Sequence, residues 1–137
     1  MKIESFTSDD NLQDFQAEIS GPVKIYKIVL SDFKESESDK ASKLAWDICN
    51  WLNSSYETIR EFCASKLLDL KNEIWLNGEE EPLNKNSFAE TIELESIAAY
   101  SDGSFTLYFD DKDNFWGHAI VVDVDKDYVL VDAQIAG

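Results

Sequence analysis

The stretch ASKLAWDICNWLNSSYETIREFCASKLLDL, residues 41–70, carries the strongest structural pattern in the chain. Its apolar residues recur every three or four positions, which is the spacing of one face of an α-helix. The members of this stripe are Ala41, Ala45, Ile48, Leu52, Tyr56, Ile59, Cys63, Leu67 and Leu70. The pattern predicts helical structure that buries this face against a hydrophobic core.

Polar residues at positions 53–55 interrupt the stripe and predict a break between two helices. Ser54 is followed three positions later by Glu57, which is the spacing of a capping box at a helix start. Trp46 and Trp51 lie beside the centre of the stripe. We expect them to widen the buried face, with the alternative that one of them stays exposed as a contact residue.

The chain after the helical region predicts an antiparallel sheet over residues 87–137, a region that opens with a short turn, Phe88 to Ile92, capped by Asn86 or Ser87. β-branched and aromatic residues concentrate in Glu93 to Ser101, Phe105 to Phe109, Trp116 to Val124 and Tyr128 to Ile135. The links between these segments are short, and one of them contains the hairpin signal Asp102-Gly103. Short links make neighbouring strands antiparallel, so we expect a β-meander whose apolar face covers the helices.

Residues 1–34 form an amino-terminal strand region. Val23 to Leu30 alternates apolar and basic residues, as a strand with one buried face does. Asp10 to Ile19 fits either a short helix or an edge strand. The chain is therefore expected to be one α+β domain, residues 1–137, with this strand region, two central helices within residues 35–77 and the carboxy-terminal antiparallel β-meander packed on the helices.

The charge balance is strongly acidic, with 28 Asp and Glu against 12 Lys and Arg and a formal net charge of -16. Such a charge repels phosphate backbones and anionic lipids, so binding to nucleic acid or membranes is not expected. It favours capture of a basic protein, although acidity also serves solubility alone. The amino-terminal residues show no secretory signal pattern, and Cys49 and Cys63 have no metal-site spacing, so we expect a cytoplasmic protein with free thiols.

His118 is the only histidine and the one candidate for a catalytic base. It follows Phe115, Trp116 and Gly117, and the sequence offers only undirected aspartates, such as Asp110, Asp111 or Asp123, as its partners. We favour a structural histidine bonded across the sheet, with Gly117 at a strand bulge. Common phosphate-binding, metalloprotease and hydrolase motifs are also missing, so the chain is not expected to be an enzyme.

Two clusters of acidic residues resemble cation sites only in part. Asp123, Asp125 and Asp127 alternate along the chain, but the glycine and distant glutamate of an EF-hand loop are missing. Residues 110–114 are rich in Asp and Asn, which form turns without a metal. We therefore expect hairpin turns at both places, no metal site and no cofactor.

Several segments resemble a known family. They are residues 66–75 (KLLDLKNEIW), Phe88, residues 115–122 (FWGHAIVV) and the terminal AQIAG of residues 133–137. Over about residues 40–137 the chain resembles the bacterial domain-of-unknown-function family 2262. The resemblance implies a fold and brings no established activity.

Small acidic α+β bacterial proteins are frequent among immunity proteins, which occupy the active or substrate-binding surface of a toxin. By this analogy of type, the sequence predicts an acidic protein-binding module that inhibits a basic toxin such as a nuclease. The predicted contacts are Glu79, Glu80, Glu81, Asp110, Asp111 and Asp113, with Trp116 as an aromatic anchor.

Two alternative functions stay open. One is a small enzyme or ligand-binding domain centred on His118. The other is an assembly module that pairs through an exposed edge strand, Tyr128 to Ile135. The sequence leaves the oligomeric state open.

Overall fold

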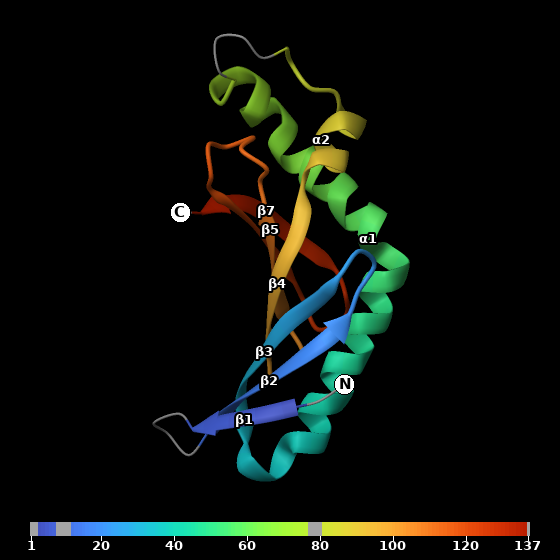
Figure 1. Cartoon of the computed structure of the whole chain (residues 1–137), viewed down its shortest axis with the longest axis vertical. Coiled ribbons are helices and arrows are strands. Elements are labelled where there is room, and N and C mark those ends of the chain that lie inside the picture. The colour runs from blue at the N-terminus through green and yellow to red at the C-terminus, as the bar shows by residue number, and fades with distance from the viewer. Residues whose placement is uncertain (1–2, 8–11, 77–80, 137) are drawn as a thin grey trace.

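A computed structural model describes residues 3–7, 12–76 and 81–136 and shows a seven-stranded sheet with one long helix across one face (Figure 1). The strands are β1 Ile3–Thr7, β2 Leu12–Ser20, β3 Ile25–Lys34, β4 Glu93–Tyr100, β5 Phe105–Asp110, β6 Ala119–Val124 and β7 Leu130–Ala136. A 3₁₀ turn, Glu35–Glu37, leads into the helices α1 Ser38–Ile74 and α2 Lys85–Thr91. The predicted α+β class is confirmed.

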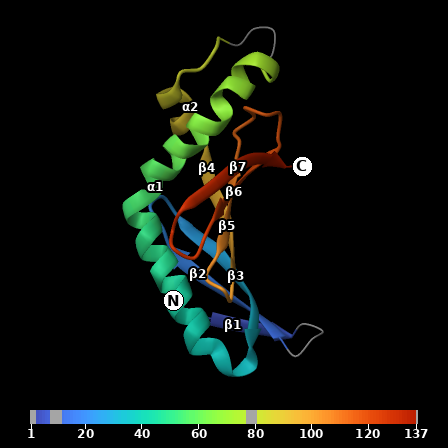
Figure 2. The same cartoon turned by 180° about the vertical axis from the view of Figure 1, so that it is seen from behind.

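The strands lie in the sheet in their chain order, β1 to β7. All neighbours are antiparallel except β3 and β4, which pair in parallel. A parallel pair needs a crossover connection, and α1 with α2 provides it. Both views show α1 running along the sheet from one end of the molecule to the other (Figures 1 and 2).

The prediction of two central helices is wrong, because α1 continues through residues 53–55. The side chains expected to cap a new helix instead form hydrogen bonds with backbone carbonyls of the preceding turn of α1. The Asn53 amide donates to the Cys49 carbonyl, and the Ser54 hydroxyl approaches the carbonyls of Asn50 and Trp51. Leu52, on the buried stripe, keeps this turn against the core, and such packing outweighs the weak local preference for a cap.

The carboxy-terminal β-meander, β4 to β7, is confirmed, but its boundaries differ from those predicted. The sheet portion begins at Glu93, after α2, whose cap is Asn84 rather than Asn86 or Ser87. The strand expected from Trp116 begins at Ala119. Residues 112–117 form turns instead, because the chain reverses direction there before it pairs with β5.

The segment Asp10 to Ile19, left open between a short helix and an edge strand, belongs from Leu12 onward to β2, which lies between β1 and β3 and is not an edge. The predicted edge at the other end is confirmed, since β7 pairs only with β6 among the described strands. The register of β7 shifts near Val131, which lies between the partners of Val124 and Asp123. Such an irregularity makes an edge less able to pair with another strand.

The core lies between α1 and the facing side of the sheet. The predicted stripe is buried from Ala41 to Leu67, and Leu70 is partly buried. Strand residues at alternate positions, such as Phe15, Ala17 and Ile19 of β2, meet it. Cys49 and Cys63 are free, buried thiols, and burial raises the pKa of Cys63 to about 12. That thiol stays protonated at neutral pH.

Replacing Ser54 by Ala tests the continuity of α1. Within a continuous helix the change should leave the unfolding free energy within about 0.5 kcal/mol of wild type or raise it, because Ala is the better helix former. Asn84→Ala is the matched control, since this true cap should lose about 1 kcal/mol. Urea unfolding followed by circular dichroism measures both, and an equal loss for the two variants would contradict a continuous α1.

Candidate functional site

The turn that carries the predicted histidine is organised by a buried carboxylate. Asp111 is only 2% exposed. Its two oxygens accept backbone N–H bonds from Asp113 at 3.1 Å, Phe115 at 2.8 Å and Gly117 at 3.1 Å. Gly117 has φ +89°, a left-handed conformation that suits glycine, so it shapes this turn and not the strand bulge that the sequence predicted.

The same turn presents aromatic rings to the end of α1. Trp75 follows the last residue of α1, and its ring centre lies 5.8 Å from Phe115, 5.0 Å from Trp116 and 5.2 Å from His118. We call these four residues the aromatic clasp. The clasp joins the carboxy-terminal end of α1 to the connection between β5 and β6. These contacts give the sequence Phe115-Trp116-Gly117-His118 a structural role.

His118 makes a local contact instead of the predicted bond across the sheet. Its Nδ1 lies 2.5 Å from the Phe115 carbonyl oxygen, because the turn brings the backbone of residue 115 back onto the ring. The candidate aspartate partners bond elsewhere. Asp110 contacts Lys112, Asp111 holds the turn and Asp123 accepts a bond from the Thr106 hydroxyl. The described residues thus supply no carboxylate partner that would orient His118 as a base.

The predicted partner contacts separate into different environments. Asp111 is buried, and both of its carboxylate oxygens accept hydrogen bonds from the backbone. The prediction that it contacts a partner is therefore wrong. Asp113 and Glu81 are exposed, and Trp116 is 59% exposed. Glu79 and Glu80 lie outside the described residues.

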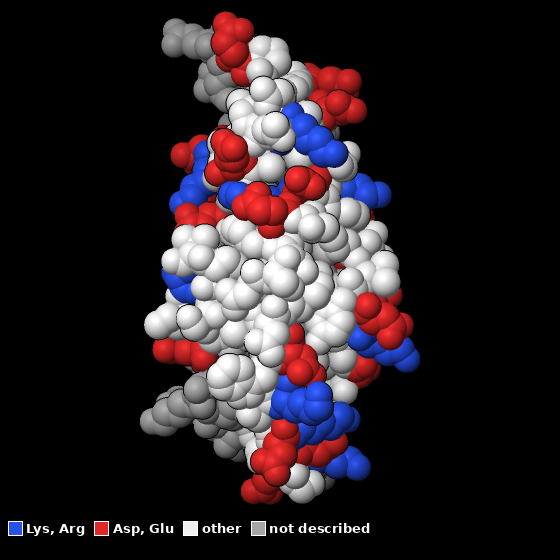
Figure 3. Space-filling model, turned by 90° about the vertical axis from the view of Figure 1, so that its right-hand side faces the viewer, with Lys and Arg blue, Asp and Glu red and all other residues white. Residues whose placement is uncertain are grey.

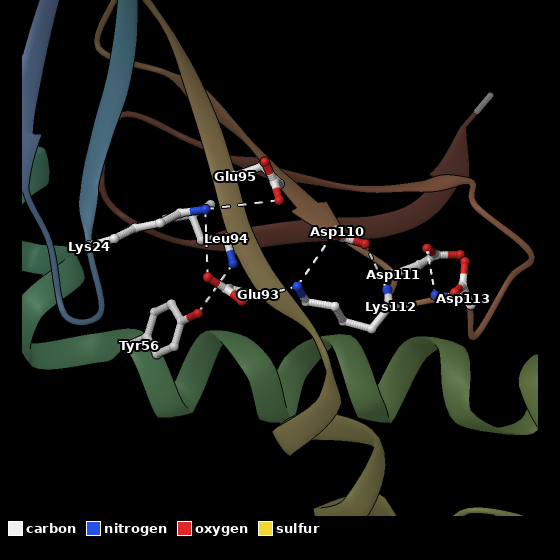
Figure 4. Close-up of polar contacts among 9 residues, drawn as sticks. All are labelled: Lys24, Tyr56, Glu93, Leu94, Glu95, Asp110, Asp111, Lys112 and Asp113. Atoms are coloured by element: carbon white, nitrogen blue, oxygen red, sulfur yellow. Dashed lines mark hydrogen bonds and ion pairs between the residues drawn. The ribbon is translucent and has the colours of Figure 1, made fainter.

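Asp110 belongs to a network of ion pairs at the start of β4 (Figure 4). Lys112 Nζ lies 3.2 Å from Glu93 and 3.6 Å from Asp110, and Lys24 Nζ lies 3.6 Å from Glu93 and 3.9 Å from Glu95. The hydrogen bond from Lys112 lowers the pKa of Glu93. Such exposed pairs contribute little stability each, but they link the β2–β3 turn, β4 and the turn after β5.

A groove of about 590 Å³ lies between α1 and the end of β2. We call it the hairpin groove. The strand side consists of residues 16–20 and Ile25, and the helix side of Trp46, Cys49, Asn50 and Asn53. Figure 3 views the side of the molecule on which α1 lies, and it shows a broad uncharged area across the middle with charged side chains toward both ends.

The tight turn between β2 and β3 builds one end of the hairpin groove. The Gly21 N–H donates to the Lys24 carbonyl at 3.0 Å, and the Tyr26 ring packs so closely on Gly21 that a Cβ there would lie 2.1 Å from it. The Cys49 thiol and the Asn53 amide both bond to the Ser20 carbonyl. These contacts hold the strand end at a fixed distance from α1.

The lining of the hairpin groove suits binding better than proton transfer. Among its described residues it contains no His, Lys or Arg, and Glu18 is its only carboxylate. Trp46 is 50% exposed and Ile25 is 65% exposed, while Gln16, Asn50 and Asn53 supply carboxamides that both donate and accept. Exposed apolar side chains gathered beside neutral polar groups are typical of interaction sites.

The sequence contained one signal for this site. Trp46 lies beside the buried stripe, and it is half exposed in the structure. The expectation that both tryptophans widen the buried face is therefore wrong for Trp46. The alternative, that one of the two stays exposed as a contact residue, describes its exposure correctly. Trp51 packs on Phe105 and Tyr128 at the core margin instead. The strand side of the groove had no such signal.

The acidic clusters behave as turns in the structure. Asp125 accepts backbone N–H bonds from Asp127 and Val129, and Asp110 accepts one from Lys112. Within residues 3–7, 12–76 and 81–136, no three His, Cys, Asp or Glu side chains come together in a way that would hold a metal ion.

The fold defines an α+β protein whose seven-stranded sheet carries one long crossover helix. Residues 2–135 match the family described as "Uncharacterized protein conserved in bacteria (DUF2262)", and the chain belongs to this family. The family resemblance of the sequence is confirmed and extends over nearly the whole chain. No curated protein and no solved structure matches it. None of the helices in the described part of the chain combines the length and apolar character needed to cross a membrane.

Substitution of Asp111 tests the role of the buried carboxylate. Asp111→Ala should lower the unfolding free energy by about 3 kcal/mol, because three backbone N–H groups lose a charged acceptor, and Asp111→Asn should lower it by less. Asp113→Asn, in the same turn but exposed, should stay within about 0.5 kcal/mol of wild type. Urea unfolding gives the comparison, and equal losses at positions 111 and 113 would refute this role.

The ion pair between Lys112 and Glu93 predicts a pH effect. A lowered carboxyl pKa stabilises the fold above the ordinary glutamate pKa, and this contribution is lost as the pH falls through the lowered value. Lys112→Met should therefore raise the pKa of Glu93 toward its ordinary value. Lys40→Met is the control, because Lys40 pairs with Glu37 instead. An NMR titration of the Glu93 carboxyl carbon would read the change, and an unchanged pKa in Lys112→Met would contradict the assignment.

Proposed function

We propose that this protein is a cytoplasmic binding module that captures a basic protein and inhibits it, in the manner of an immunity protein acting on a toxin. The observation that carries the proposal is the contrast between the charge of the chain and its groove. A chain of net charge -16 presents a groove whose described lining, apart from Glu18, consists of apolar and neutral polar side chains, among them a half-exposed tryptophan.

The charge and the groove would serve two separate steps of protein recognition, long-range attraction and close contact. The acidic surface attracts a basic partner over about 8 Å at physiological ionic strength and raises the association rate. The apolar anchors act only at contact, where aromatic residues contribute much of the binding energy. Polyanionic character also matches the groove of a nuclease, which binds phosphates through Lys and Arg.

Two further observations support binding without catalysis. The described residues supply no carboxylate that orients His118, and those that line the hairpin groove include no histidine or lysine that could act as a base for Cys49. Cys49 and Cys63 are unpaired, as a reducing cytoplasm allows.

Affinity capture from a lysate of the source organism, after nuclease digestion, tests the proposal. At about 50 mM salt the chain should retain a basic protein, and at about 300 mM it should retain less of it, because salt screens the attraction. The captured protein is then assayed for its own activity, such as nucleic-acid cleavage, which added chain should suppress. Retention of acidic proteins alone, salt-insensitive retention, or no effect on the captured activity would each count against the proposal.

Charge variants locate the acidic contacts once a partner is in hand. Replacing Glu79, Glu80 and Glu81 by Gln should slow association severalfold at low salt, because these acids are predicted to lie at the contact. The control is the triple variant Glu61→Gln, Asp69→Asn, Glu73→Gln. It also removes three negative charges, but from exposed positions of α1. Stopped-flow or surface binding kinetics measure both on-rates. Equal slowing would mean that net charge alone steers association and that Glu79, Glu80 and Glu81 make no special contact.

A further inference from the structure

We infer that the outer face of the sheet, on the side opposite α1, is a second docking surface and binds a basic amphipathic helix of a protein partner. The inference goes beyond the proposed function, because the surface lies on β4, β5 and β6 and shares no lining residue with the hairpin groove.

The outer face is the side of the sheet that α1 leaves uncovered. In the described part of the chain, no helix lies across it (Figures 1 and 2). Along β4, β5 and β6, buried residues alternate with residues that point away from the core. We call the outward residues of these strands the outer strip, which consists of Ser96, Ala98, Tyr100, Thr106, Tyr108, Ala119 and Val121. The three strands consist of described residues only.

The outer strip carries no charged side chain, although 29% of the chain is Asp, Glu, Lys or Arg. The charged outward residues of the same strands lie toward the strand ends, as Glu93, Asp110 and Asp123 do. A sheet face that meets only water usually carries polar and charged residues. The centre of a protein interface is instead depleted in charge and enriched in tyrosine. The outer strip therefore has the composition of a contact surface.

The strand pairing and the small side chains of the outer strip favour a helix as the occupant. An extended segment would need a free strand edge, and the outer-strip residues of β4, β5 and β6 pair with described strands on both sides. Ser96 and Ala98 are small, and Ala98 lies directly opposite Thr106. Small side chains let a helix lie close to β4, as α1 lies on the other face, and helices on both faces of a sheet are a common arrangement.

Two carboxylates beside the outer strip set the charge of the helix. Asp123 of β6 and Asp132 of β7 are direct partners across the two strands, so their side chains share the outer face. The Thr106 hydroxyl donates to Asp123 at 3.2 Å, but the described ion pairs include neither carboxylate. Like charges directly opposite each other destabilise a sheet. A Lys or Arg of a bound helix would neutralise them.

The cation beside the outer strip does not change this conclusion. Lys27 of β3 lies opposite Ser96 on one side and opposite Glu18 on the other, so a carboxylate balances its charge. A second copy of this chain is a poorer occupant than a basic helix, because two copies would bring -16 against -16.

Selection from a displayed library of small helical proteins, with the surface of one helix randomised, tests the inference without knowledge of the partner. Enriched helices should carry apolar residues three and four positions apart, flanked by Lys or Arg. They should bind Ala98→Lys and Val121→Lys each at least about tenfold more weakly than wild type, because each variant places an unpaired positive charge in the contact. Amide NMR shifts should locate the helix at β4, β5 and β6.

Ser65→Lys is the matched control for these two variants. It adds the same charge at an exposed position of α1, on the other side of the sheet, and should bind within about twofold of wild type. Urea unfolding confirms that each variant is folded, and two independent positions keep the test decisive if one of them is not.

Asp132→Asn separates binding from stability. It should weaken helix binding severalfold and raise the urea midpoint of unfolding, because the pair of like charges is gone. Asp69→Asn, at an exposed position of α1, is the control and should change both quantities less. A lower midpoint with unchanged binding would mean that Asp132 serves the fold and not a partner.

Several results would overturn the inference. They are no enrichment, enrichment of helices without Lys or Arg, equal binding to wild type and to both lysine variants of the outer strip, and NMR shifts outside β4, β5 and β6. A mass that rises with concentration, together with the same NMR shifts in the chain alone, would also overturn it, because a second copy would then occupy the face.

The two proposals fail separately. If a basic protein is captured and inhibited but no helix is enriched on the outer strip, the proposed function stands and the docking surface fails. If helices are enriched as expected but no protein is captured, the docking surface stands and the proposed function fails.

Discussion

Burial of the apolar stripe of α1 against the sheet is the interaction on which the rest of the structure depends. The helix has 37 residues and is about 55 Å long, and its buried stripe lies on strands from both halves of the chain. Each buried leucine or isoleucine contributes roughly 1.5 to 3 kcal/mol of transfer free energy. Because α1 is also the crossover between β3 and β4, the same contacts that form the core place the amino-terminal strands beside the carboxy-terminal meander.

The tryptophans near the two ends of α1 lie in different environments. At the carboxy-terminal end, Trp75 packs in the aromatic clasp, whose turn is held by the buried Asp111 carboxylate. The most distinctive residues of the sequence are therefore used to fix the helix end, where His118 contacts the Phe115 carbonyl and the Trp75 ring. In the amino-terminal half, Trp46 is left half exposed at the hairpin groove, beside a strand end tied to the helix by Cys49 and Asn53. The molecule thus uses aromatic residues for structure at one end of α1 and leaves one of them half exposed toward the other.

Charge and shape act at different ranges in the proposed binding. The excess of acidic residues is spread over many elements and produces a long-range attraction for a basic partner. It does not specify a contact, because exposed ion pairs are weak and screened by salt. A neutral groove with an aromatic anchor and carboxamides is needed to fix orientation, and this division explains why Glu18 is the single charged residue among those described in the hairpin groove.

The sequence by itself determined the features that depend on local periodicity and turn chemistry. The α1 stripe, the Asp102-Gly103 hairpin, the strands after residue 93 and the free thiols all follow from residue types and spacing. Tertiary structure decided whether α1 breaks at residues 53–55, because burial of Leu52 and its neighbours outweighs a local capping preference. It also decided the parallel pairing of β3 with β4, the burial of Asp111 and the hairpin groove. The groove joins residues 16–25 to residues 46–53, and no local pattern records a contact between segments that only the packing of α1 on the sheet brings together.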